Sequence, residues 1–111
     1  MNDHDLLIMA ANAHGGISWD GEDTDSMGED GRWWSPLEDD GDALRLSSRL
    51  YLDVCFYRGF EEVIIQGEGT KDTPNSLGEI LEVREPFGID IASATRRAIV
   101  RAAAEIGRSM K

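Results

Sequence analysis

The sequence predicts an α+β fold in which a three-stranded antiparallel sheet is packed by a long C-terminal helix and two shorter helices. An alternating segment at residues 51–57 and a run of β-branched residues at 63–65 predict neighbouring strands. Apolar residues at helical spacing from Ala92 to Met110 predict the long helix. Because 111 residues are enough for one modest core, we expect a single domain over residues 1–111.

The N-terminal segment predicts a short helix. Asn2 or Asp3 can cap the free amides of its first turn, and Gly15 can end it. We expect this helix to pack against the core, because three residues recur at i, i+4 and i+7 and give it one apolar face. These residues are Leu6, Ala10 and Ala13.

Residues 17–34 predict a short strand followed by a flexible acidic loop. Ile17–Trp19 favour the strand, whereas residues 20–31 hold six acids and three glycines and almost no side chain that a core could bury. Trp33 and Trp34 follow, and both are too large and apolar to remain in water without reason. At least one of them should anchor the end of the loop to the core.

The next segment predicts a turn and a second helix. Pro36–Glu38 fit the turn, and Asp39 or Asp40 can cap a helix that runs from about Asp40 to Leu50. Helical spacing brings three apolar residues to its inward face with a fourth beside them. The inward residues are Ala43, Leu46 and Leu50, and Leu44 lies beside them.

Three strands should follow, because two short antiparallel hairpins are the simplest way to join them. In the first strand, Leu52, Val54 and Phe56 alternate with polar residues and should share the covered face. Pro86 should end the sheet after the third strand. The expected strands are Tyr51–Tyr57, Glu61–Gln66 and Glu79–Arg84.

The C-terminal helix is the clearest element of the sequence. It carries an apolar stripe for the sheet and, on its opposite side, the arginines 97, 101 and 108. These arginines could contact nucleic acid, form a solvated face, or neutralise the acidic loop within one chain or between two. The stripe consists of Ala92, Thr95, Ile99, Ala103, Ile106 and Met110.

The charge of the chain is strongly negative and uneven. The net charge is −11 with a pI near 4.4, and residues 1–46 hold twelve acids against Arg32 and Arg45. Residues 86–111 reverse the sign, with five bases against two acids. Because the total charge repels a phosphate backbone, we expect no direct binding to nucleic acid and an attraction to a protein partner with a basic surface.

The sequence shows no recognisable catalytic motif. The single Cys55 cannot form an intramolecular disulfide, and its strand neighbours offer no base that would make it a nucleophile. His4 and His14 stand at the two ends of the first helix, too far apart to share a small metal ion. No secretion signal and no membrane span is visible, which favours the cytoplasm. We therefore expect neither an enzyme nor a membrane protein.

The acidic loop resembles a calcium site only in part. Asp23, Asp25 and Gly28 match the first, third and sixth positions of a calcium loop. The fifth and twelfth positions, which require oxygen ligands, are Met27 and Trp34. We therefore expect a solvated loop without a metal, and no cofactor elsewhere in the chain.

Two segments resemble a known family. WSPLEDDGDALRLSSRL, residues 34–50, and ATRRAIVRAAAEIGRSM, residues 94–110, are similar to two blocks that occur in this order in a family of small proteins of tailed bacteriophages and prophages. The two blocks cover about a third of the chain. No activity is assigned to that family, so the resemblance implies a phage origin and the cytoplasm of a bacterial host.

The leading functional hypothesis is a non-enzymatic phage accessory protein that binds another macromolecule through an acidic surface, and inhibition of a host defence protein is its sharper version. The alternatives are a small component of virion assembly or genome packaging, which could form a homodimer, and an enzyme whose site is built from scattered residues. The expected outer members of the binding surface are Asp20, Glu22, Asp23, Asp25, Glu29, Asp30, Trp33 and Trp34.

Overall fold

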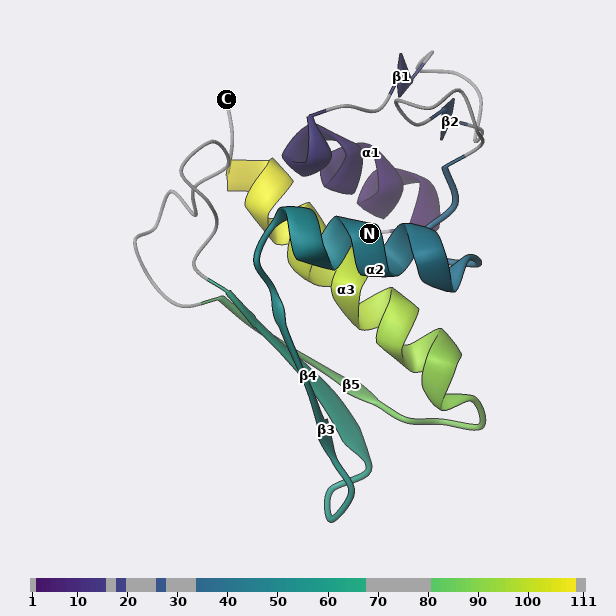
Figure 1. The fold of residues 1–111 in the computed structure, drawn as a ribbon, viewed down its shortest axis with the longest axis vertical. Helices are drawn as coiled ribbons and strands as arrows, with labels where there is room; N and C mark the ends of the chain where they lie inside the picture. The colour runs from purple at the N-terminus through teal and green to yellow at the C-terminus, as the bar shows by residue number, and fades with distance from the viewer. Residues whose placement is uncertain (1, 16–17, 20–25, 28–33, 68–80, 110–111) are drawn as a thin grey trace.

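The structure is a computed structural model that describes residues 2–15, 18–19, 26–27, 34–67 and 81–109 (Figure 1). Its elements confirm the α+β fold, with a three-stranded antiparallel sheet in the order β3-β4-β5 and a long C-terminal helix packed on it. Along the chain they are α1 (Asp3–His14), β1 (Ser18–Trp19), β2 (Ser26–Met27), α2 (Asp40–Arg49), β3 (Asp53–Tyr57), β4 (Glu62–Gly67), β5 (Leu81–Pro86) and α3 (Ile91–Ser109).

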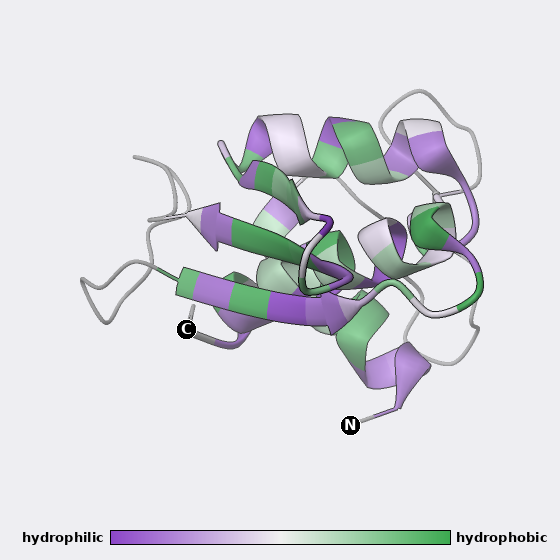
Figure 2. Ribbon diagram, turned by 90° about the horizontal axis from the view of Figure 1, so that it is seen from below, coloured by the Kyte–Doolittle hydropathy of each residue, from purple (hydrophilic) through white to green (hydrophobic). Residues whose placement is uncertain are grey.

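The sheet and the helices form successive layers. Figure 2 shows the three strands in front with the helices behind them, so the helices lie on one side of the sheet. α3 lies across β4 and β5, and α1 packs on the far side of α3 (Figure 1). We expected the two shorter helices to pack at the edge or on the same face of the sheet. Both lie on the helix side of the sheet, and both make their main contacts with α3 rather than with the strands.

α1 and α3 approach closely because small residues meet between them. Ala10 and Ala13 of α1 are fully buried. At Gly107 of α3, an added Cβ would lie 2.7 Å from the carbonyl carbon of Met9 and 3.2 Å from the amide nitrogen of Ala13. The backbones of the two helices are therefore in direct contact at Gly107, where α3 has no side chain to hold α1 away.

The expected signals delimit α1. Asn2 is its N-cap, and the Asn2 side chain accepts a 2.8 Å hydrogen bond from the Asp5 amide. Gly15 adopts the left-handed conformation at φ 84° and donates to the carbonyl oxygen of Ala11. The predicted start and end of this helix are confirmed.

α2 ends in a turn that displaces the start of β3. Leu50 is the C-cap, and Tyr51 follows at φ 54°. The Leu52 amide donates to the Ser47 carbonyl at 2.9 Å, and the Tyr51 amide donates to the Ser48 carbonyl at 3.2 Å. These two bonds define a Schellman motif, in which glycine is the usual residue at the left-handed position. β3 therefore begins at Asp53, two residues later than predicted.

The other two strands of the sheet are shifted towards the C-terminus relative to the prediction. Glu62 to Gly67 of β4 pair with β5, and Glu62 lies opposite Pro86. Pro86 is the last residue of β5, which confirms the prediction that the sheet ends there. An edge strand tolerates proline because one side of its backbone needs no ladder hydrogen bond. Glu79, the predicted start of this strand, lies outside the described residues.

A second, two-stranded sheet lies where a loop was expected. Ser18 pairs with Met27 and Trp19 with Ser26, in antiparallel register. The short strand at the predicted position is confirmed for residues 18–19. Ser26 and Met27 are strand residues inside the predicted acidic loop, and the other residues of that loop lie outside the described part of the chain.

The core confirms the predicted helical stripes in part. In the α3 stripe, Ala92 is exposed and Thr95 is only half-buried, because both line the open space beside α2 and β3, and Met110 lies outside the described residues. Ile99, Ala103 and Ile106 of α3 are buried, and so are Leu46 and Leu50 at the end of α2. They pack with the inward face of the sheet and with α1 in one cluster, whose sheet residues are Val63, Ile65 and Val83.

Candidate functional site

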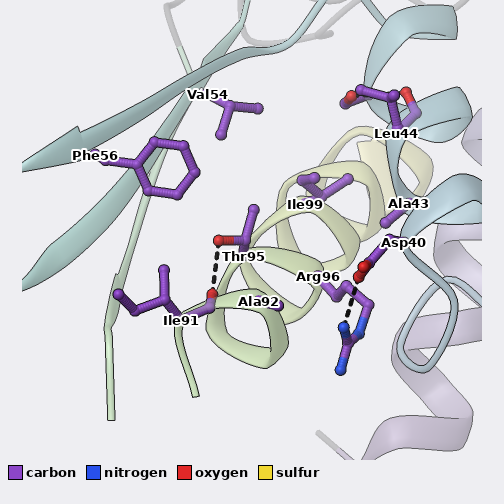
Figure 3. A pocket seen from close by; sticks show the side chains of 11 residues that line it. Asp40, Ala43, Leu44, Val54, Phe56, Ile91, Ala92, Thr95, Arg96 and Ile99 are labelled. Atoms are coloured by element: carbon purple, nitrogen blue, oxygen red, sulfur yellow. Dashed lines mark hydrogen bonds and ion pairs between the residues drawn. The ribbon is translucent and has the colours of Figure 1, made fainter. Parts of the chain in front are cut away.

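An open apolar groove lies between α2, β3 and the first half of α3 (Figure 3). Its volume is about 520 Å³. In Figure 3, Val54 and Phe56 stand on the β3 side, Leu44 and Ala43 on the α2 side, and Ile99 on the helix between them. We call this feature the α2–β3 groove; its lining residues are Asp40, Ala43, Leu44, Ser47, Val54, Phe56, Ile91, Ala92, Thr95, Arg96 and Ile99.

The groove exists because the helix layer does not cover β3. Phe56 lies opposite Val63 in the sheet and therefore points to the inward face, as predicted. α3 covers β4 and β5, which leaves the inward face of β3 open. Phe56 is 56% exposed and was wrongly expected to be covered, and Leu44 of α2 is 64% exposed. Large apolar side chains thus meet water on both walls.

The hydroxyl groups that line the groove already donate hydrogen bonds within the chain. The Ser47 hydroxyl donates to the carbonyl oxygen of Leu44 at 2.8 Å, and the Thr95 hydroxyl donates to the carbonyl oxygen of Ile91 at 2.8 Å. Both bonds close on the backbone of the helix that carries the hydroxyl. These side chains therefore offer mostly methyl and methylene surface to a ligand.

The charged pair of the groove is also engaged. The Arg96 guanidinium donates to Asp40 at 2.6 Å and to the carbonyl oxygen of Leu37 at 2.9 Å. This arginine ties the start of α2 to α3, and Figure 3 shows the pair at one end of the groove. Asp40 keeps most of its carboxylate in water, because its side chain is 77% exposed.

The end of the groove near this pair is acidic. α2 and α3 both begin there (Figure 1), so their first turns and preceding residues share this end. Four of its carboxylates are exposed, and the neighbouring Arg45 and Arg96 pair with Asp39 and Asp40. We call it the acidic mouth; its exposed carboxylates are Glu38, Asp39, Asp40 and Asp90. Asp42 is buried and accepts from Arg45 and from the Ser35 amide.

Two more large apolar side chains are exposed outside the groove. Phe60 at the turn between β3 and β4 is 74% exposed, and Ile89 before α3 is fully exposed. The Phe87 amide donates to the Glu61 carbonyl at 2.7 Å, which holds the two connections at the same end of the molecule. A patch of this kind on a soluble protein commonly marks an interaction surface.

The arginines of α3 bind carboxylates of the same chain. Arg97 reaches Asp3 of α1 at 2.9 Å, and Arg101 pairs with Glu85 of β5. Arg108 pairs with Glu105 one turn earlier, at 2.8 Å. These partners belong to α1, β5 and α3 itself. The interpretation that the stripe neutralises the acidic loop stays a prediction, because the acids of that loop lie outside the described residues.

The outer face of the sheet is polar and centred on Arg84. Arg84 lies 3.1 Å from Glu82 and 3.6 Å from Glu62, and Gln66 donates to Glu82 at 3.0 Å. The hydrogen bonds from Gln66 and then Arg84 lower the pKa of Glu82, and Glu82 raises the pKa of Arg84. These polar side chains lie around Ile64, which is buried on the face of the sheet away from α3.

Of the predicted binding residues, only Trp34 is described. It is 7% exposed, and its ring lies edge-on to that of His14 with centroids 6.0 Å apart. This confirms that one tryptophan anchors the end of the loop, and it removes Trp34 from the accessible surface. The remaining predicted residues lie outside the described part of the chain, and their role stays a prediction: Asp20, Glu22, Asp23, Asp25, Glu29, Asp30 and Trp33.

The sequence reasoning missed the α2–β3 groove. The strongest indication of an exposed apolar surface in the sequence was the presence of Phe60 and Ile89 in turn segments. Large apolar side chains in turns stay exposed to water unless a partner covers them. Cys55, a half-buried free thiol, lies opposite Ile64 on the outer face of the sheet and outside the groove. Within the described ranges, no group of three or more His, Cys, Asp or Glu side chains could hold a metal ion.

Comparison with protein-family models, with curated proteins and with solved structures found no match to this chain. In the part of the chain that the structure describes, no helix combines the length and the apolar character that a membrane crossing needs. The likeness to proteins of tailed bacteriophages therefore stays a prediction from two sequence blocks.

Proposed function

We propose that this chain is an accessory protein of a tailed bacteriophage or prophage that acts in the host cytoplasm by binding a basic host protein. The observation that carries the proposal is the α2–β3 groove with its exposed Leu44 and Phe56. Exposed aromatic and aliphatic side chains around a concave surface are typical of the anchoring sites of protein interfaces.

The size of the apolar surface favours a protein over a small ligand. A groove of about 520 Å³ could hold a small molecule by its volume alone. However, Phe60 and Ile89 are also exposed, outside the groove, at the end of the molecule where the β3–β4 turn meets the segment before α3. A small ligand would leave these side chains in water, whereas a protein partner could cover them.

The charge of the chain favours a basic partner over a second copy. With a net charge of −11, two copies repel each other at low salt, which disfavours a homodimer. An acidic protein attracts basic surfaces and can occupy a groove that normally binds nucleic acid. Inhibition of a host defence protein in this manner is the specific form of the proposal.

Affinity purification from infected cells tests the proposal with a matched pair of variants. Phe56→Ser removes an aromatic ring from the groove, whereas Tyr57→Ser removes the next ring along β3, which points to the outer face of the sheet. We expect a host protein to be recovered with the wild type and with Tyr57→Ser, and to be lost with Phe56→Ser. Recovery of the same proteins with all three chains would overturn the groove as the binding surface.

The same experiment separates the alternatives. A virion protein lost with Phe56→Ser would indicate a role in assembly or packaging instead. If all three chains bring down no protein at all, binding is not the function, and an enzyme built from scattered residues becomes the better hypothesis.

A further inference from the structure

We infer that the α2–β3 groove binds an amphipathic α-helix of the partner, with basic residues beside its apolar stripe. This inference depends on the proposed function, because it names the kind of segment that the same groove would bind. Three features of the groove lead to it: the spacing of its walls, the engagement of its polar atoms, and the charge at its mouth.

The walls of the groove have the geometry of a helix-packing site. α2 presents Asp40, Ala43, Leu44 and Ser47, a stripe at helical spacing, and α3 presents a second stripe that includes Ala92, Thr95 and Ile99. Alanine, serine and threonine on these stripes let another helix approach to about 8–10 Å between axes.

The sheet also has space for one more helix. A helix is about 10 Å wide and neighbouring strands are about 4.8 Å apart, so one helix covers roughly two strands. α3 covers β4 and β5, and the inward residues of β3, Val54 and Phe56, have no helix above them. A helix laid over β3 would contact both stripes and complete the layer.

The polar atoms of the groove favour a helix over an extended segment. The Ser47 and Thr95 hydroxyls donate their protons inside the chain, and Arg96 donates to Asp40 and to the Leu37 carbonyl. An extended peptide lying over the groove would therefore bury main-chain carbonyls with few donors to pair with, which is unfavourable. A helix satisfies its own main chain and can bury an apolar stripe without this cost.

The acidic mouth determines the charge of the helix. Asp40 lines the groove at this end, and Asp90 directly precedes Ile91, which also lines it. Lysine or arginine residues beside the apolar stripe would pair with these carboxylates, whereas a second copy of this acidic chain would be repelled. Charge complementarity therefore selects a basic amphipathic helix.

The test uses two synthetic peptides of the same leucine and lysine composition and of about 14 residues, a length at which a helix is marginally stable alone. One has leucine at helical spacing, and the other alternates leucine and lysine as a strand would. Each is titrated into the full-length, isotope-labelled chain while amide NMR signals and the helix content are recorded. The Phe56→Ser and Tyr57→Ser chains are titrated in parallel.

We expect the helical peptide to shift amide signals of Ala43–Ser47, Val54–Phe56 and Thr95–Ile99 and to gain helix content on binding. Phe56→Ser should weaken this binding about tenfold, which is the scale of losing one anchoring aromatic ring, and Tyr57→Ser should leave it unchanged. Replacing the lysines of the peptide by glutamates should abolish binding.

Three results would overturn the inference. Tighter groove binding by the alternating peptide would indicate an extended partner segment. Displacement of the helical peptide by a fatty acid at lower concentration would indicate an apolar small molecule. Binding that Phe56→Ser does not change would show charge attraction alone. In each case, recovery from infected cells of a host protein that is lost with Phe56→Ser would still support the proposed function. A failure of this inference is therefore distinguishable from a failure of the proposed function.

Discussion

Replacement of Gly107 by alanine should separate α1 from α3. The new Cβ would lie 2.7 Å from the carbonyl carbon of Met9, and a backbone group cannot rotate away as a side chain can. Overpacking costs about 1–3 kcal/mol, and alanine returns about 1 kcal/mol through its higher helix propensity. Because the Met9 backbone cannot rotate away and α1 would have to move as a unit, the overpacking cost should lie at the upper end, about 3 kcal/mol, and the net loss is then about 2 kcal/mol.

Urea unfolding followed by far-UV circular dichroism measures this loss, and amide exchange in α1 locates it. A matched control is Gly41→Ala in α2, whose new Cβ would meet only the side chains of Arg45 and Asp39 at 3.2 Å. The control should be as stable as the wild type or gain up to about 1 kcal/mol. If Gly107→Ala behaves like this control and α1 keeps its protection from exchange, the reasoning about the helix contact is refuted.

Three further predictions concern single side chains. Tyr51→Gly should raise the unfolding free energy by about 1 kcal/mol in the same urea assay, because glycine adopts the left-handed conformation without strain. Asp42→Ala should lower it by about 2 kcal/mol, because the Ser35 amide loses the buried carboxylate that accepts its 2.8 Å hydrogen bond. The fold lowers the pKa of Glu82, so its contribution to stability is present at neutral pH and is lost as the pH falls through the folded value. Glu82→Gln should therefore reduce the acid-side decline in melting temperature, and an unchanged decline would contradict this assignment.

Local signals predicted the fold well where they act within a few residues. Asn2, Asp39 and Gly15 delimit their helices as expected, because capping depends on one side chain and the next turn of backbone. The stripe of α3 faces the core, because helical spacing survives in any packing arrangement. The start of β3 was misplaced because Tyr51 adopts a backbone conformation that tyrosine rarely takes.

The candidate site could not be predicted in the same way. The burial of Phe56 depends on whether a helix lies above β3, which is decided by the crossing of α2 and α3 and not by the sequence around Phe56. The acidic loop was predicted to be the binding surface because its composition is unusual. The described residues of that region form a small hairpin and include the buried Trp34. Composition identified the charge, and tertiary packing produced the groove.

The central position of α3 has a consequence for how the chain folds. α3 contacts α1, α2, β4 and β5, and it follows all of them in the sequence. None of these contacts can form during synthesis until α3 has been made, at about 5–20 residues per second. Contacts between elements far apart in the sequence, such as α1 and α3, also slow folding, because the long loop must close before they form. We expect the inward face of the sheet to stay exposed until α3 packs against it.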